Sequence, residues 1–222
     1  MFFTLYYFTF ATYSCRDFTC FYSPAVGTFS HNSGLTTQIE DIVKRVCDTS
    51  IRLRIYARSS LQVHLQEVYS QPFSLTSIGL LDDPTLIACA VNSTCGALLA
   101  AGVQLDCTFA AVPCALLDTD TPGETQVVLA SEQQRLRTSS VRCLATAVLS
   151  NANCRTPAAK QALLDTEPAS NGYPSLAGDL IAFITHSGRC TPTQLVTLVR
   201  FARRAAVNIF ESYETALRSN SN

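Results

Sequence analysis

Ten cysteines are the residues of this 222-residue sequence that most readily suggest chemistry, because a thiolate can bind a metal or act as a nucleophile. No Cys-x-x-Cys pair occurs, and the three histidines, His31, His64 and His186, lie far apart along the chain. Tetrahedral zinc sites usually use closely spaced ligand pairs. The spacing therefore indicates no metal site, and we expect no cofactor.

Several cysteines fall within stretches typical of strands or helices, where a free thiol packs as a small apolar group. They are Cys89, Cys95, Cys107, Cys114 and Cys143. We interpret this set as typical of a reducing, intracellular compartment rather than of a disulfide framework.

Asp118 and Asp120 could be proposed as a catalytic pair, because carboxylates can act as general acid and base. Both lie in the turn sequence DTDTPG. Aspartate is favoured in turns because its side chain bonds the local backbone, so we assign both residues a structural role. No Gly-x-Ser-x-Gly elbow occurs either, and no cysteine has an evident partner base in the sequence.

The overall composition describes a globular chain with little net charge. Hydrophobic residues make up 47% of the sequence, which is ample for one substantial domain or two small ones. The formal charge is −1 and only 15% of the residues are charged, so no global field attracts nucleic acid or an acidic membrane surface. Any such binding needs a local patch.

The opening stretch, MFFTLYYFTFATYSC, is aromatic and carries no charge before Arg16. It lacks the basic region of a signal peptide and is too short to span a bilayer as a helix. Its composition suits a β-strand, or a segment whose start was wrongly assigned. No other stretch is long and apolar enough to cross a membrane, so we expect no membrane partner.

Hydrophobic spacing predicts the elements of the first half. A β-type run over 18–24 precedes a helix whose capping box is Thr37 and Glu40 and which continues to about Asp48. Residues 61–68 alternate in polarity as a half-buried strand does, with His64 on the polar side. We expect that histidine to be solvated or hydrogen-bonded rather than catalytic.

The stretch 86–102 predicts a helix with little bulk on any face and no charged residue. Its small residues are Ala88, Ala90, Ser93, Gly96, Ala97, Ala100 and Ala101. Gly102 follows as a C-terminal cap would. Because such a helix lets neighbouring backbones approach closely, we expect it to lie inside the molecule.

The second half predicts strands and a long closing helix. The strands cover 107–117, 125–130, 141–149 and 179–188, a short polar helix or turn precedes the third of them, and 150–178 is interpreted as a surface insertion. Pro113 indicates an edge or a bulge. The amphipathic helix covers 191–218, with Pro192 in its first turn. Strands grouped between helices without regular alternation indicate an α+β fold, a mixed sheet with packed helices.

Three stretches in this order resemble the ribonuclease PH family, which has a ribosomal protein S5 domain 2-like fold, and more closely the ring subunits of the eukaryotic RNA exosome. The family's Arg-Ser-x-Ile strand start corresponds to Arg58-Ser59-Ser60-Leu61, and its small-residue helix corresponds to Asn92 through Gly102. The ending NIFESYETAL is similar to the C-terminal helix of these subunits.

The resemblance implies a ribonuclease PH-like domain over 16–222 and an atypical segment over 1–15. Strands that the family places before Phe18 are expected to be truncated, either because the true start has been lost or because the sheet is incomplete.

Enzymes of that family hold inorganic phosphate with a Gly-Gly-Thr-Arg stretch just ahead of the small-residue helix, where helix amides and a guanidinium meet the anion. Counting back from Asn92 places that stretch on 84–87, so the arginine position holds Ile87. Asp82 and Asp83 stand just before it, and two carboxylates there would repel phosphate.

The family's acidic positions fall near Ala130 and Val141, which can neither transfer a proton nor bind an ion. The resemblance therefore implies no catalytic residue. It implies a non-catalytic relative of the archaeal phosphorolytic subunit, within a hexameric ring of ribonuclease PH-like exosome subunits that meets cap subunits and threads RNA. Expected locations are the nucleus, including the nucleolus, and the cytoplasm.

Two alternatives stay open from the sequence: a phosphate-dependent 3'-to-5' exoribonuclease, and a stand-alone domain that binds RNA or protein. The candidate RNA-phosphate contacts are Arg52, Arg54 and Arg58, because a guanidinium bonds phosphate in pairs. These arginines fit equally well as solvated or ion-paired positions beside a strand. A further group, Arg200, Arg203 and Arg204, is expected on the polar face of the last helix.

Overall fold

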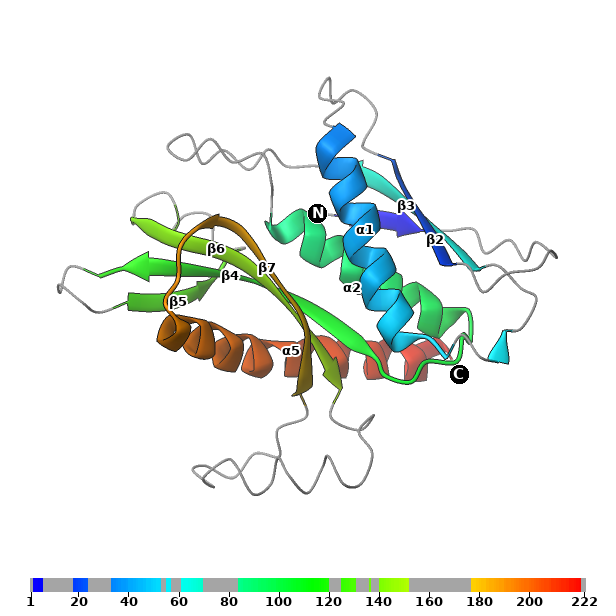
Figure 1. Cartoon of the computed structure of the whole chain (residues 1–222). Coiled ribbons are helices and arrows are strands. Elements are labelled where there is room, and N and C mark those ends of the chain that lie inside the picture. The colour runs from blue at the N-terminus through cyan, green and yellow to red at the C-terminus, as the bar shows by residue number, and fades with distance from the viewer. Residues whose placement is uncertain are drawn as a thin grey trace.

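The computed structural model describes residues 2–5, 18–23, 33–52, 55–56, 61–69, 84–119, 125–130, 136, 140–151 and 177–220. Its elements are β1 (Phe2–Leu5), β2 (Phe18–Ser23), α1 (Ser33–Ser50), β3 (Leu61–Tyr69), α2 (Pro84–Ala100), β4 (Phe109–Asp118), β5 (Thr125–Leu129), β6 (Val141–Asn151), β7 (Ala177–Gly188) and α5 (Pro192–Asn220) (Figure 1). The predicted α+β class is confirmed. No helix in these ranges is both long and apolar enough to cross a membrane.

The strands form two sheets where a single mixed sheet was predicted. The smaller sheet has the order β1-β3-β2 and is mixed, since β1 runs antiparallel and β2 parallel to β3. The larger has the order β5-β4-β6-β7 and is antiparallel throughout. The aromatic N-terminal stretch thus supplies a strand over Phe2–Leu5, as its composition predicts.

Helix α2 lies between the two sheets (Figure 1). It contacts β4 and β6 of the larger sheet, β1 and β3 of the smaller one, and helix α1. Ten of its 17 residues are buried, which places them on more than one face of the helix. Of the small residues predicted from the sequence, Ala88, Ala90 and Ala97 are buried in this packing. Ala100 and Ala101 are exposed, and a Cβ atom at Gly96 would meet nothing within 4 Å, so the close-packed part of the helix is shorter than predicted.

Gly102 ends α2 as predicted. Its φ is +67°, a left-handed conformation that glycine adopts without steric cost. The Gly102 amide donates to the Leu99 carbonyl at 3.1 Å and the Val103 amide to the Leu98 carbonyl at 3.0 Å. This pair of bonds is the Schellman motif, which satisfies the last carbonyls of the helix.

The predicted capping box of α1 is wrong. The helix begins at Ser33, so Thr37 lies inside it. The Glu40 carboxylate is engaged elsewhere, because its Oε1 accepts a hydrogen bond of 2.9 Å from the Tyr22 amide on the open edge of β2. A Thr-x-x-Glu spacing also occurs within helices, where the backbone donors are already bonded.

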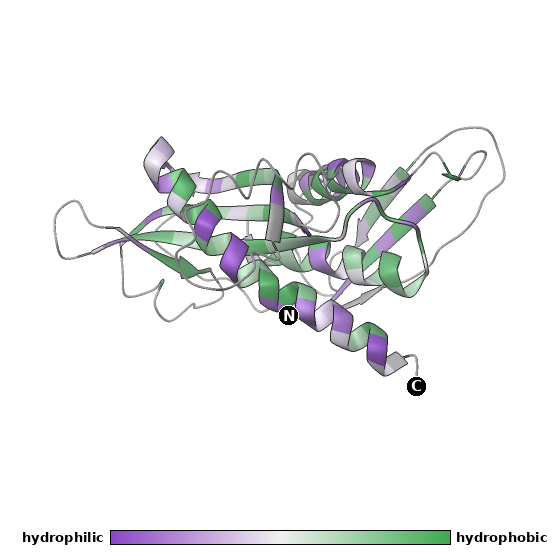
Figure 2. Ribbon diagram, turned by 90° about the horizontal axis from the view of Figure 1, so that it is seen from below, coloured by the Kyte–Doolittle hydropathy of each residue, from purple (hydrophilic) through white to green (hydrophobic). Residues whose placement is uncertain are grey.

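Helix α5 packs on the other face of the larger sheet and presents one apolar stripe. Figure 2 shows hydrophilic and hydrophobic residues alternating along it. The buried members of the stripe are Leu198, Ala202, Ala206 and Phe210. Arg200 and Arg204 are exposed and Arg203 is half-buried, which agrees with the predicted polar face.

The capping box that forms is at the start of α5. The Thr191 amide donates to the Gln194 side chain at 2.9 Å, and the Gln194 amide approaches the Thr191 hydroxyl at 3.4 Å. Pro192 follows as the first helical residue, where its missing amide hydrogen costs nothing.

Strand β4 is paired unequally on its two sides. Strand β6 pairs with it from Phe109 to Leu117, whereas β5 pairs only from Cys114 to Asp118. Pro113 marks the point where the β5 pairing stops, and its carbonyl accepts from the Ala130 amide at 2.9 Å. The predicted edge at Pro113 is therefore confirmed on the side of β4 that faces β5, where the strand pairing begins only at Cys114.

The predicted insertion over 150–178 is shortened at both ends by strands. Strand β6 continues to Asn151 and β7 begins at Ala177, while 152–176 lie outside the described residues. Gly188, with φ +79°, closes β7. A Cβ atom there would overlap the Arg142 carbonyl, so only glycine fits.

Candidate functional site

The first turn of α2 meets the larger sheet at a small polar cluster, which we call the Thr146 cluster: Pro84, Thr146 and His186. Thr146 is buried on β6 and His186 is half-buried on β7. The Thr146 hydroxyl donates to the Pro84 carbonyl at 3.2 Å, and the His186 Nε2 lies 2.8 Å from the same hydroxyl. These bonds connect the start of the helix with two strands.

One hydroxyl hydrogen fixes the direction of both bonds. Because the Thr146 hydrogen goes to the Pro84 carbonyl, the hydroxyl oxygen accepts from His186, whose ring then carries a hydrogen on Nε2. In this arrangement the histidine positions the threonine that holds the helix. The cluster therefore has a structural role, because its bonds hold the start of α2 against the larger sheet, although its side chains are of types that also bind anions in other proteins.

The first turn of α2 offers little to an anion. Its residues, Pro84 to Ile87, carry no charge, and proline has no amide hydrogen to donate. Leu86 is 5% exposed and Ile87 is 0% exposed, within the core cluster between the sheets. Asp82 and Asp83 lie outside the described residues.

The two positions matched to acidic residues of the family hold apolar side chains that pack in or against the core. Ala130 is buried and its amide donates to the Pro113 carbonyl, while Val141 is half-buried at the start of β6.

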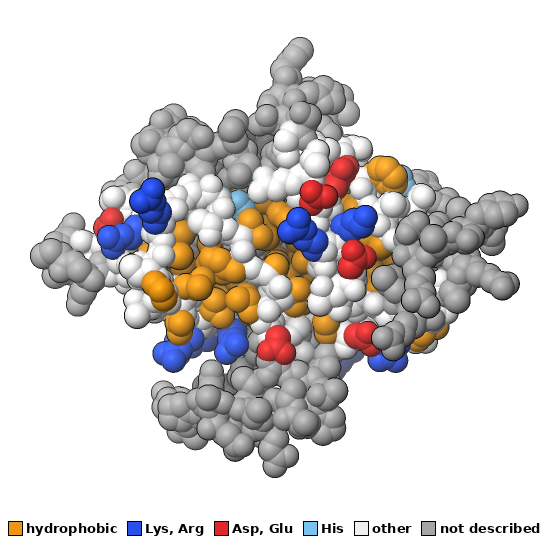
Figure 3. All heavy atoms as spheres, in the orientation of Figure 1, with side chains coloured by type: hydrophobic (Ala, Val, Ile, Leu, Met, Phe, Trp, Pro, Cys, Tyr) orange, Lys and Arg blue, Asp and Glu red, His pale blue; other side chains and the backbone are white. Residues whose placement is uncertain are grey.

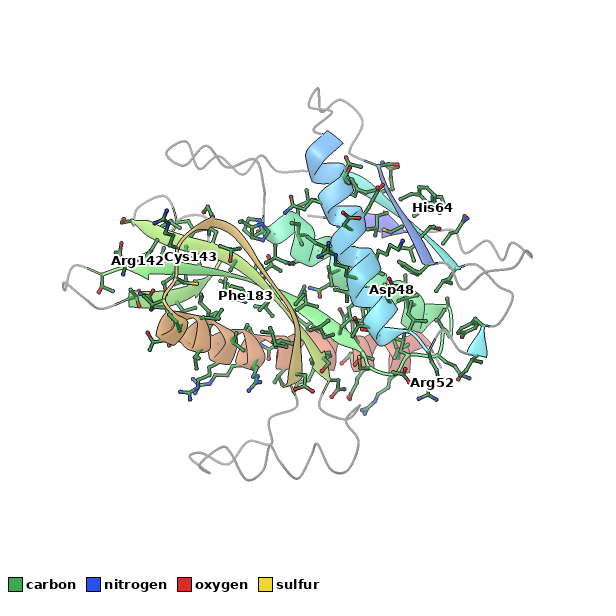
Figure 4. The ribbon with its side chains drawn as sticks, in the orientation of Figure 1. Asp48, Arg52, His64, Arg142, Cys143 and Phe183 are labelled. Atoms are coloured by element: carbon green, nitrogen blue, oxygen red, sulfur yellow. The ribbon has the colours of Figure 1, made fainter. Side chains whose placement is uncertain are left out.

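Asp118 ends β4 and forms an exposed ion pair of 3.3 Å with Arg142, which Figure 4 places near one end of the larger sheet. Asp120 lies outside the described residues.

Of the three candidate RNA contacts, the structure describes one. The Arg52 Nε lies 2.6 Å from Asp106 Oδ1, and both side chains are about half exposed, at 51% and 53%. Exposed ion pairs contribute about 0–1 kcal/mol, so a phosphate could replace the aspartate. Arg54 and Arg58 lie outside the described residues, and the RNA contact stays a prediction.

Asn92 has a role that the sequence did not indicate. Its Nδ2 donates to the Ala111 carbonyl at 2.9 Å, and its Oδ1 accepts from the Ala111 amide at 2.7 Å. Ala111 lies on the stretch of β4 beyond the reach of β5. The side-chain amide thus takes the place of the missing strand partner, and the Tyr213 hydroxyl donates to the Asn92 carbonyl at 3.2 Å.

The buried cysteines among the described residues are thiols held in the core rather than activated nucleophiles. Burial raises the pKa of Cys20, Cys95 and Cys114 to about 12. Burial, and then its neighbour Cys190, raises the pKa of Cys143 to about 11. A reactive cysteine needs a lowered pKa. Within the described part of the chain, no group of His, Cys, Asp and Glu side chains is placed to hold a metal.

A groove of about 650 Å³ runs between α1 and β7. Its lining is Gly34, Thr37, Gln38, Asp41, Ile42, Arg45, Phe183 and Ile184. The lining carries one acid and one base, one helical turn apart on α1. Figure 3 likewise shows acidic and basic side chains interspersed over this helix, so this face has no patch of a single charge.

Comparison with known proteins supports the fold directly. No protein-family model matches the chain, and no curated protein matches it by sequence. The crystal structure of rice (Oryza sativa) Rrp46 is similar to it with a TM-score of 0.64 and 20% sequence identity, over 97% of this chain and 82% of the rice chain. The two sheets, the helix pair between them and the outer helix are thus the layers of a ribonuclease PH-like fold, as the sequence predicted.

Proposed function

We propose that this chain is a non-catalytic subunit of an RNA exosome ring, which supports 3'-to-5' RNA processing and degradation as a scaffold and by threading RNA. The fold shared with rice Rrp46, an exosome subunit of ribonuclease PH type, supports this function. We propose the nucleus, including the nucleolus, and the cytoplasm as its locations.

The observation that carries the non-catalytic part is the burial of Ile87. The resemblance places the phosphate-binding arginine at this position, and here the side chain is 0% exposed among apolar neighbours. An aliphatic group in that place supplies no hydrogen bond or charge to an anion. Ala130, at a matched acidic position, is likewise buried and has no group that could transfer a proton.

The assembly is tested by purifying the tagged full-length chain from the cells that make it and identifying bound proteins by mass spectrometry. We expect several ribonuclease PH-like proteins of similar size, together with cap subunits and RNA. A chain that elutes as a stable monomer without such partners would contradict the ring subunit and favour a stand-alone binding domain.

Catalysis is tested separately on the purified chain with single-stranded RNA and inorganic phosphate. We expect no nucleoside diphosphates, with a known phosphorolytic ribonuclease as the positive control. Nucleoside diphosphates that disappear when phosphate is omitted would show a phosphorolytic exoribonuclease instead.

A further inference from the structure

Two rings are stacked on the outer face of the smaller sheet. The parallel register of β2 and β3 places Phe21 beside His64. Their ring centroids are 4.9 Å apart and their planes differ by 20°. Phe21 is 45% exposed, and His64 is also exposed; Figure 4 shows His64 on the side of the molecule away from the larger sheet.

The described side chains around this pair are polar. Strand alternation brings Thr19, Gln62 and Gln66 to the same face, while the residues between them point into the core. The Gln66 Nε2 donates to the Glu67 carbonyl at 3.2 Å, which holds one amide beside the rings. Among the described side chains of this face, the two rings are thus surrounded by polar groups, unlike the broad apolar patches by which proteins dock.

We propose that Phe21 and His64 form a stacking site for an unpaired base of single-stranded RNA. Every base has a flat π face, and single-stranded RNA is commonly held by bases stacked on exposed aromatic rings of a sheet. Gln62 and Gln66 flank the rings with polar side chains, which suits a polar nucleotide better than an apolar partner. The choice of RNA as the occupant rests on the proposed function.

The chain contains no tryptophan, which allows a direct optical test. In the full-length Phe21→Trp variant, we expect added oligouridylate to quench the indole fluorescence, because a stacked base quenches it. The matched control is Leu180→Trp, whose site is 38% exposed on the larger sheet and should not be quenched. Quenching of both variants alike, or of neither, overturns the proposal.

Binding of the same fluorescein-labelled RNA by anisotropy gives the second readout. We expect Phe21→Ala to raise the dissociation constant between about fivefold and a hundredfold, and Phe21→Tyr to restore it. Circular dichroism checks that each variant is folded. Unchanged affinity in Phe21→Ala, or no RNA binding by the parent chain, overturns the site.

The two proposals fail independently. If the chain co-purifies with exosome proteins but Phe21 has no effect on RNA binding, only the stacking site is wrong. If Phe21 binds RNA but no ring partners are found, the chain is a stand-alone RNA-binding domain with this site intact.

Discussion

Helices α2 and α5 pack on opposite faces of the same strand, β4, yet they tolerate very different side chains. α2 lies between two sheets and has no charged residue, whereas α5 has one buried stripe and exposes Arg200, Arg204 and Val196 on its other side. The difference follows from the number of layers that each helix contacts. A charge on α5 can reach water, while a charge in the buried part of α2 cannot.

The largest expected effect is that of Ile87→Arg, the change that introduces the arginine which the sequence resemblance implies for phosphorolytic enzymes. It places an unpaired charge in the core, and we expect the free energy of unfolding to fall by about 3–5 kcal/mol or more. Urea denaturation measures this loss, with Ile87→Val, at about 0.5–1.5 kcal/mol, as the matched control. A stable Ile87→Arg protein that binds phosphate would show that α2 can open to the solvent.

The buried thiols of the core predict a pH dependence of similar size. Burial raises the pKa of Cys20, Cys95 and Cys114 from 9.0 to about 12, so the folded chain keeps protons that the unfolded chain releases. Stability is therefore complete below pH 9 and falls as the pH rises toward 12, by about 1.4 kcal/mol per thiol at pH 10.

Thermal unfolding at pH 7, 9 and 10 measures this loss. Replacing Cys114 by Ala should lower the stability at pH 7 and make the decline above pH 9 shallower. A melting temperature that is the same at pH 7 and pH 10 would mean that these thiols are accessible to water.

Asn92→Ala tests the contact between α2 and the open stretch of β4. Both backbone groups of Ala111 would lose their partner, and we expect a loss of about 2–4 kcal/mol. The second variant is Asn92→Asp, which keeps an acceptor for the Ala111 amide but places a carboxylate opposite its carbonyl. Chemical denaturation should show both variants less stable than the parent; equal stability of all three would contradict the assigned role.

The smallest effect is expected at α5. Thr191→Ala removes the capping box and should cost about 1 kcal/mol. Val196→Ser, on the exposed face where the side chain is 50% exposed, should change the stability by less than about 0.5 kcal/mol. If Val196→Ser lowers the free energy of unfolding more than Thr191→Ala does, this face of α5 is covered by another surface.

Hydrophobic spacing was enough to predict the strands, the helices and the α+β class, because each pattern reports the local period of its own element. It placed Gly102 and Pro113 correctly, since their backbone limits are intrinsic to the residue. It failed at Thr37, where the capping-box spacing lies inside a helix, and it missed the same spacing at Thr191, where the box forms. The division into two sheets needed long-range pairing that local patterns do not contain.

The candidate site shows the same limit. The aliphatic position at Ile87 was predictable from the motif order, whereas the contact of Thr146 with His186 joins residues 40 positions apart on neighbouring strands. The register between β6 and β7 shifts between Leu144 and Ala145. This shift changes the face of the sheet on which the β7 side chains near His186 lie. The bonds of Asn92 to Ala111 likewise depend on where β5 stops, which only the folded chain defines.

The bonds made by Asn92 have a consequence for the chain when it is crowded by copies of itself. A strand with open amides and carbonyls can recruit a strand from another molecule and start fibrous association. Because one amide side chain already occupies the Ala111 groups, an intruding strand finds no bonding partner there. The Asn92 side chain thus blocks the pairing of a second molecule's strand with β4 at Ala111.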